Sequence, residues 1–145
     1  PPSMASCTRD IYAPHTRFSL GAALQLAHGI ASAMRHLHQR GITHGDLYAH
    51  NILHDGQGQA LLGDFGAAWL LGSTAPSTAQ ALQQLEVRAF GCLLEELLDR
   101  CYVEGLAHDA LAGLQDLKQQ CLRETPAERP GFEVIEDWIA TLRSR

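Results

Sequence analysis

Apolar residues recur every three or four positions between Leu20 and Gln39, and this spacing predicts an α-helix. They form two adjacent stripes on that helix, so most of its surface should be buried. Ser19 can cap the first turn, and Gly41 stands where a left-handed residue commonly ends a helix. The pattern predicts a buried helix with both ends marked by the sequence.

Two short apolar runs follow this helix, at 51–54 and 59–63. The residues between them, 55–58, contain an Asp-Gly step, which is a strong signal for a turn between antiparallel strands. We therefore expect a small β-hairpin. Residues 71–78 are small, polar and turn-prone, and they predict a loop.

Further helices are expected because apolar residues recur three or four positions apart in three later segments, at about 80–100, 107–122 and 132–143. One stripe on the first of these helices predicts core residues, namely Phe90, Leu93, Leu94 and Leu97. The link 125–130 contains two prolines and should be rigid. The predicted fold class is mainly α with one small β-hairpin.

Composition narrows the class of protein. With 145 residues, of which 46% are hydrophobic, the chain can form one domain with one core. Acidic residues outnumber basic ones, 16 to 11, and no basic stripe is present, which argues against a nucleic-acid partner. The apolar runs are shorter than a membrane span, and the four cysteines form no Cys-x-x-Cys pair, so a cytoplasmic location is expected.

The chemistry is concentrated in residues 44–51 and 64–66. Phosphoryl transfer needs a carboxylate that orients the attacking hydroxyl and accepts its proton, together with oxygen ligands that hold Mg²⁺ against the phosphates. Asp46, Asn51 and Asp64 could supply this set. The histidines are spread over helix and loop positions without a common face, so a zinc site is not expected.

Several segments resemble the protein kinase family. The pattern His-x-Asp-x-x-x-x-Asn at 44–51, followed by Asp-Phe-Gly, is similar to the family's catalytic-loop and metal-binding motifs. Residues 85–97 resemble its central buried helix, and 121–132 resemble its C-x-x-x-x-P-x-x-R-P-x-F segment. These signatures occur in the family's order and cover about 20–139.

The resemblance implies a C-terminal kinase lobe at 19–145, preceded by a hinge or linker at 1–18. ATP and Mg²⁺ would be the cofactors and a protein hydroxyl the acceptor. Asp46 would be the catalytic residue, and Asn51 and Asp64 would bind the metal and nucleotide. Structural support for the catalytic loop would come from three further residues, His44, Glu86 and Gly66.

The nucleotide-binding lobe of such a kinase is largely missing from the sequence, because no Gly-rich loop or Val-Ala-Ile-Lys strand precedes Leu20. We therefore expect an excerpt of a longer protein, with the other lobe as a partner in the same polypeptide and little activity by itself. The sequence of residues 44–53 is also similar to that of bacterial kinases of eukaryotic type, some of which are joined to leucine-rich repeats.

The sequence departs from the family pattern at several positions. Gly45 replaces an arginine that binds a phosphorylated activation loop in many protein kinases. Tyr48 replaces a lysine that, in serine/threonine kinases, helps to neutralise the transferring phosphate. Glu86 replaces an aspartate and adds a methylene. Only 22 positions separate Asp64 from Glu86, without the usual Ala-Pro-Glu, so Arg129 needs another partner.

These departures leave two other functions open. A small-molecule kinase of the aminoglycoside or choline type is favoured by Gly45, although the Asp-Phe-Gly motif belongs to the protein kinase pattern. A pseudokinase that serves as a binding module is favoured by Tyr48 and the short segment after Asp64.

Overall fold

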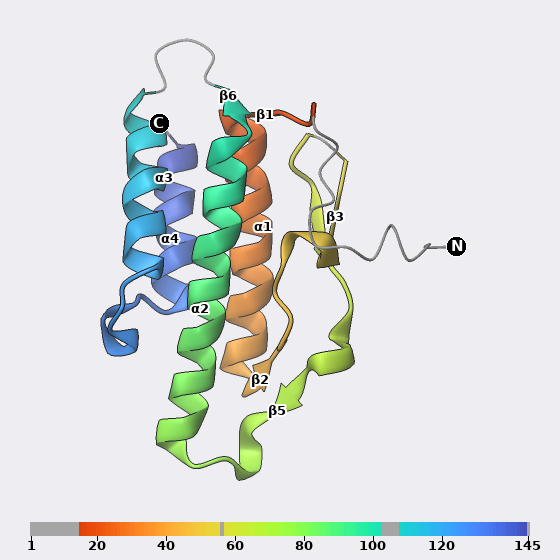
Figure 1. Cartoon of the computed structure of the whole chain (residues 1–145), viewed down its shortest axis with the longest axis vertical. Helices are drawn as coiled ribbons and strands as arrows, with labels where there is room; N and C mark the ends of the chain where they lie inside the picture. Colours follow the sequence, from red (N-terminus) through yellow and green to blue (C-terminus); the bar gives the residue numbers. More distant parts are fainter. Residues whose placement is uncertain (1–14, 56, 103–107, 145) are drawn as a thin grey trace.

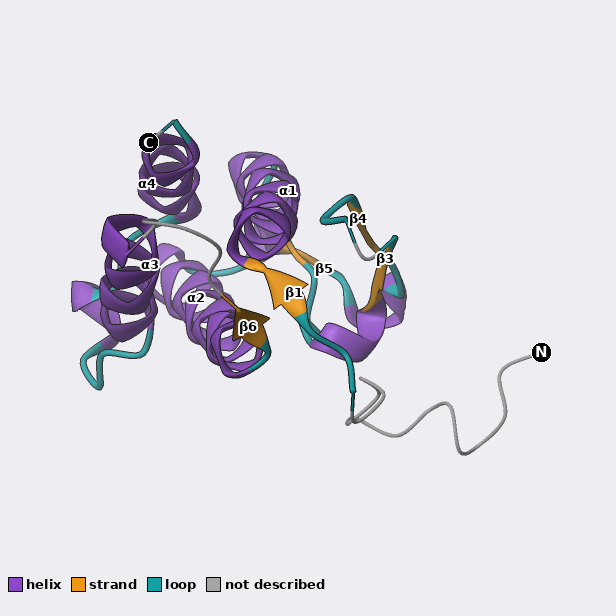
Figure 2. Ribbon diagram, turned by 90° about the horizontal axis from the view of Figure 1, so that it is seen from above, coloured by secondary structure: helices purple, strands orange, loops and turns teal. Residues whose placement is uncertain are grey.

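A bundle of four helices forms most of the fold. The computed structural model describes residues 15–55, 57–102 and 108–144, so most of the predicted hinge segment, 1–14, lies outside the described residues. The helices of the bundle are α1 (Leu20–Gln39), α2 (Pro76–Asp99), α3 (His108–Cys121) and α4 (Phe132–Arg143). Their axes run roughly side by side, with α1 between α4 and the strands on its other side (Figures 1 and 2).

The first predicted helix is confirmed at both ends. Ser19 caps α1, because its hydroxyl accepts a hydrogen bond of 3.2 Å from the amide of Ala22. Gly41 follows the last turn with φ +66°, which is the left-handed conformation expected there. The apolar stripes of α1 are buried against α4 on one side and against the hairpin on the other.

The predicted hairpin is also confirmed. Strand β3 (Ile52–His54) pairs antiparallel with β4 (Ala60–Leu62), and Leu53 lies opposite Leu61. At the turn, Gly58 has φ +102°, and a Cβ at this position would lie 2.6 Å from the carbonyl oxygen of Ala22. The turn therefore approaches α1 so closely that glycine is required.

Two pairs of very short strands were not predicted. Strand β1 (Phe18–Ser19) runs parallel to β6 (Cys101–Tyr102), and β2 (Ile42–Thr43) pairs antiparallel with β5 (Trp69–Leu70). The β2 and β5 pair brings the segment that follows Asp64 back to the end of α1 (Figure 1). The β2 and β5 pair thereby joins the two ends of the segment 44–68, which carries the candidate site residues.

A loop was predicted over 71–78 and a helix start near residue 80, and the predicted boundary between them was wrong. A single 3₁₀ turn covers Leu71–Ser73, and α2 already begins at Pro76. Proline is well suited to the first helical position, because its fixed φ fits a helix and the amide it lacks has no partner there. Four further residues therefore belong to α2.

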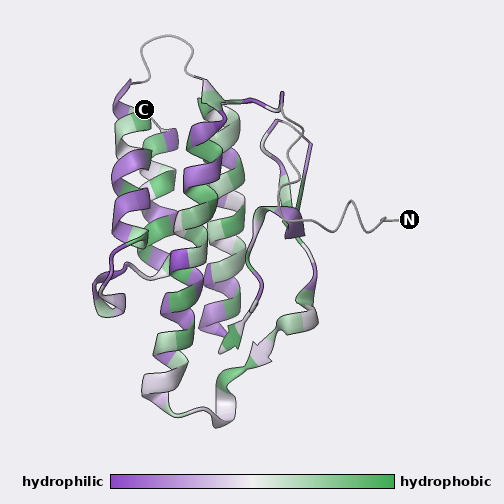
Figure 3. Ribbon diagram, in the orientation of Figure 1, coloured by the Kyte–Doolittle hydropathy of each residue, from purple (hydrophilic) through white to green (hydrophobic). Residues whose placement is uncertain are grey.

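The remaining helices agree with the sequence pattern, and hydrophobic and hydrophilic residues alternate around each of them (Figure 3). The predicted core stripe of α2 is confirmed, because its four residues are at most 2% exposed: Phe90, Leu93, Leu94 and Leu97. The fold class, mainly α with one small β-hairpin, is likewise confirmed. None of the helices in the described ranges is long and apolar enough to cross a membrane.

Candidate active site

The candidate catalytic loop, residues 44–51, connects β2 to β3 and begins with a fully buried histidine. Nε2 of His44 lies 2.8 Å from the carbonyl oxygen of Gly63, and Nδ1 accepts a hydrogen bond of 3.3 Å from the amide of Asp46. Because Nδ1 is an acceptor, Nε2 carries the proton and donates to Gly63. The His44 ring also meets the Phe65 ring edge-on, with centroids 4.8 Å apart. His44 thus links the loop to the segment that contains Asp64.

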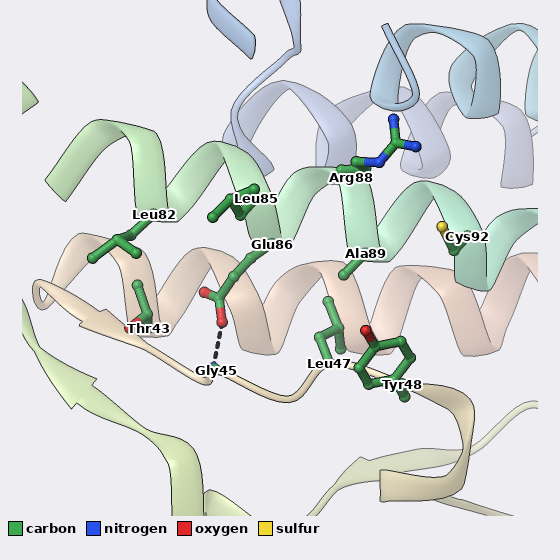
Figure 4. A pocket seen from close by; sticks show the side chains of 10 residues that line it. All are labelled: Thr43, Gly45, Leu47, Tyr48, Leu82, Leu85, Glu86, Arg88, Ala89 and Cys92. Carbon is green, nitrogen blue, oxygen red and sulfur yellow. Dashed lines mark hydrogen bonds between the residues drawn. The ribbon is translucent and has the colours of Figure 1, made fainter. Parts of the chain in front are cut away.

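Gly45 needs to be glycine for two reasons. Its φ is +82°, and a Cβ would lie 2.3 Å from the carbonyl oxygen of Ala67. Its amide donates a hydrogen bond of 2.6 Å to Oε1 of Glu86 (Figure 4). The arginine that many protein kinases have at this position has no room here.

Glu86 joins three parts of the fold. The residue is 6% exposed, and while Oε1 of its carboxylate accepts from Gly45, Oε2 lies 2.7 Å from Nε2 of His38. These residues belong to α2, to the loop and to α1, respectively. Glu86 was predicted from the sequence, whereas His38, whose contact with it spans 48 positions, was not.

Asp46 and Asn51 lie in direct contact. The Asn51 amide nitrogen donates to the Asp46 carbonyl oxygen at 2.7 Å and to Oδ2 of its carboxylate at 3.0 Å. Asn51 is 8% exposed, whereas 35% of the Asp46 side chain is exposed. The carboxylate is therefore held from the protein side and open on the other.

Asp64 is brought close to this pair through the backbone. The amide of Gly63 donates to the carbonyl oxygen of Asn51 at 2.8 Å. Asp64 itself has φ +51°, and its Oδ1 accepts a hydrogen bond of 3.2 Å from the amide of Gly66. The left-handed residue of the Asp-Phe-Gly motif is thus the aspartate, and Gly66 is not in that conformation.

Asn51 and Asp64 fit a magnesium ion. Within the described residues, no hydrogen bond occupies Oδ1 of Asn51 or Oδ2 of Asp64. Amide and carboxylate oxygens are hard ligands of the kind Mg²⁺ prefers, and Mg²⁺ commonly combines one or two protein ligands with water and phosphate oxygens. The described part of the chain contains no cluster of three or more His, Cys, Asp or Glu side chains that could hold a metal.

His50 lies beside Asp46 and Tyr48 lies against His50, and neither contact was predicted from the sequence. Nε2 of His50 is 3.8 Å from Oδ2 of Asp46, and the His50 ring stacks on Tyr48 with centroids 5.7 Å apart. His50 lies in a single 3₁₀ turn, Ala49–Asn51. The spacing of four positions between Asp46 and His50 could have predicted this contact, because residues at that spacing are neighbours on a helical turn.

A cavity of about 350 Å³ opens between the loop and α2 (Figure 4). Gly45 and Leu47, which flank Asp46 in the sequence, line one wall. The rest of the lining is mostly apolar and includes Tyr48, Leu82, Leu85 and Ala89. The cavity therefore places an apolar surface next to the residue predicted to be catalytic.

Arg129 is 7% exposed and has backbone partners in place of a glutamate. Its guanidinium donates to the carbonyl oxygens of Arg123 at 2.8 Å, Gln84 at 2.9 Å and Glu124 at 3.3 Å. Nearby, burial raises the pKa of the Cys121 thiol to about 12, against a smaller lowering by the Arg129 charge. The thiol is therefore un-ionised at neutral pH.

The sequence is similar to those of known proteins. Residues 4–85 match the family described as protein kinase domain. The mouse tyrosine-protein kinase Srms is 29% identical over 88% of this chain and 34% of its own length. The Arabidopsis thaliana leucine-rich repeat receptor-like protein kinase PXC2 is 35% identical over 53% of this chain and 8% of its own length.

A bacterial relative is similar too. The serine/threonine-protein kinase PrkC of Bacillus subtilis is 35% identical over 52% of this chain and 14% of its own length. The chain thus spans about a third or less of these relatives. The family match covers more than half of the chain and includes the candidate catalytic loop and the Asp-Phe-Gly motif. The chain belongs to the protein kinase family.

Proposed function

We propose that the chain carries the phosphoryl-transfer centre of a protein kinase that moves the γ-phosphate of ATP to a protein hydroxyl. The observation that carries this proposal is the contact between Asp46 and Asn51, in which one carboxylate oxygen is held at 3.0 Å and the side chain remains 35% exposed. A fixed but accessible carboxylate is what an acceptor hydroxyl needs.

In the proposed mechanism, Asp46 orients the acceptor hydroxyl and takes its proton. Asn51 and Asp64 would hold Mg²⁺, which would neutralise charge at the phosphates. His44 and Glu86 keep the loop in place through Gly63 and Gly45.

The relatives support a protein acceptor over a small molecule, because all three are named as protein kinases. One is named a tyrosine kinase and another a serine/threonine kinase, so they favour neither hydroxyl. The apolar cavity beside the loop is suited to a side chain of the acceptor protein. A leucine-rich repeat region elsewhere in the protein would resemble PXC2, and this part of the proposal rests on that name alone.

The test is transfer of radiolabelled phosphate from ATP by the whole protein. Wild type is compared with Asp46→Asn and with the matched control Asp116→Asn, which changes an exposed aspartate on α3. We expect Asp46→Asn to slow labelling of a generic protein substrate by about 100-fold or more. The control should label at the wild-type rate.

Other outcomes of this experiment would replace the proposal. Asp46-dependent labelling within a panel of hydroxylated small molecules, without labelling of protein, would assign a small-molecule kinase. No transfer to either, with ATP still bound, would assign a pseudokinase. Phosphoamino-acid analysis of labelled protein distinguishes serine or threonine from tyrosine.

A further inference from the structure

The two oxygens of the Asp46 carboxylate have different surroundings. Oδ2 accepts from the amide nitrogen of Asn51 at 3.0 Å and faces Nε2 of His50 at 3.8 Å. Oδ1 forms no hydrogen bond or ion pair within the described residues. One oxygen is therefore bracketed by two side chains, while the other is available to an acceptor.

The His50 ring is held in this position by Tyr48. The two rings are nearly parallel, at 18°, with their centroids 5.7 Å apart. Stacked aromatic rings at this separation attract each other. Only 17% of the His50 side chain is exposed, so the ring lies mostly within the loop.

The second ring nitrogen of His50 has no evident structural use. Nδ1 is buried and has no hydrogen-bond partner among the described residues. An unpaired buried polar atom costs free energy, and such atoms in native structures call for a functional explanation. With the proton on Nε2, the ring presents a donor to Asp46 and leaves Nδ1 as the unpaired acceptor.

We propose that His50, held by Tyr48, is a positioning residue that fixes Oδ2 of Asp46 so that Oδ1 faces the acceptor hydroxyl. The inference rests on the proposed function. The separation of 3.8 Å is longer than a hydrogen bond, and catalytic contacts of this kind often shorten when the substrates are bound. Tyr48, which replaces the family's lysine, then serves the loop as a platform for His50.

Four variants of the whole protein separate this role from simple packing. His50→Ala removes the donor, and His50→Gln keeps a donor at a similar reach. Tyr48→Leu removes the ring, and Tyr48→Phe keeps it. For His50→Ala we expect kcat to fall roughly 10- to 100-fold, with the KM for ATP changed by less than about two-fold.

Tyr48→Leu should also lower kcat. His50→Gln should keep most of the kcat that His50→Ala loses, and Tyr48→Phe most of the kcat that Tyr48→Leu loses. The double variant Tyr48→Leu/His50→Ala should be no slower than His50→Ala, because both changes act on one contact. An unchanged kcat in His50→Ala overturns the proposal. So does a Tyr48→Phe variant that is as slow as Tyr48→Leu, because the hydroxyl and not the ring would then matter.

A second measurement does not depend on activity. The ¹⁵N resonances of the His50 ring are recorded in wild type, Asp46→Asn and the control Asp116→Asn. We expect a protonated Nε2 whose resonance shifts only in Asp46→Asn. If the His50 resonance shifts in Asp46→Asn while wild type transfers no phosphate, the proposed function is wrong but the contact between His50 and Asp46 is present. If Asp46→Asn leaves the ring resonances unchanged, the contact is absent and the inference fails.

Discussion

Oε1 of Glu86 accepts a hydrogen bond of 2.6 Å from the amide of Gly45, and this bond fastens the candidate catalytic loop to α2 (Figure 4). The other oxygen of the same carboxylate lies 2.7 Å from Nε2 of His38. Glutamate has one more rotatable bond than the aspartate usual in the family, so a single partner would orient it less well. His38 supplies the second partner, and the longer side chain is thereby held at both oxygens.

Replacing Glu86 with alanine should destabilise the protein markedly. The Gly45 amide and the His38 ring would both lose the partner that the buried Glu86 carboxylate supplies, and a hydrogen bond to a charged group contributes about 1.5–3 kcal/mol. Urea denaturation measures the change in the free energy of unfolding. Glu95→Ala, at an exposed position of the same helix, is the control and should change it by about 0.5 kcal/mol or less. Equal losses in the two variants would contradict the argument.

Gly45→Ala should cost more stability than Gly41→Ala. Both glycines have a positive φ, +82° and +66° respectively, so both variants meet the backbone penalty of about 1 kcal/mol. At Gly41 nothing lies within 4 Å of the added Cβ, whereas at Gly45 the Ala67 carbonyl oxygen is 2.3 Å away. The same denaturation experiment compares them, and a Gly45→Ala variant as stable as Gly41→Ala would show that the Ala67 segment can move aside.

The sequence predicted those elements whose signals are local. Helix α1 was predicted to the residue, because its apolar spacing, the Ser19 cap and Gly41 all lie within the segment itself. The β1 and β6 pair was missed because each strand has two residues and Phe18 meets Cys101 across 83 positions. Such a pairing depends on the packing of the helices between the strands, and no short window of sequence contains it.

In the candidate site, too, the residues with a local sequence signal were predicted and those that depend on long-range contacts were not. Motif spacing identified Asp46, Asn51 and Asp64, and the structure brings the first two into hydrogen-bonding contact. His38 was missed because its partner lies on another helix. The three carbonyl partners of Arg129 could not be predicted either. Every residue has a backbone carbonyl, so the residue types do not indicate which ones accept these hydrogen bonds.

Arg129→Lys should destabilise the protein although it keeps the charge. The guanidinium donates to three carbonyl oxygens through Nε and both terminal nitrogens, and an ammonium group cannot reproduce this fork. We expect a loss of about 1–3 kcal/mol, because at least one of the hydrogen bonds that the buried guanidinium donates is lost. Thermal unfolding compares this variant with Arg123→Lys, at an exposed position. A neutral Arg129→Lys would mean that charge alone is required.

The Arg35 and Glu136 pair, which joins α1 to α4 at 3.0 Å, should make stability depend on acid pH. Burial by itself raises the pKa of Glu136, but hydrogen bonds from Arg35 and Ser32, with the charges of Arg35 and His28, bring that pKa below its ordinary value. The unfolded chain then binds the proton more readily. The stabilisation is present above about pH 4.3, the ordinary glutamate value, and is lost as the pH falls through the lower folded pKa.

Glu136→Gln removes this titration and tests the sign. Wild type should be more stable than the variant at pH 7, and the difference should shrink as the pH falls through the lowered folded pKa of Glu136, where the folded carboxyl also takes up its proton. Glu133→Gln is the control, because Glu133 is 3.6 Å from Arg35 with 69% of its side chain exposed, and exposed ion pairs contribute little. Thermal unfolding followed across this pH range gives both differences. A Glu136→Gln difference that stays constant with pH would show that the pair acts through packing and not through charge.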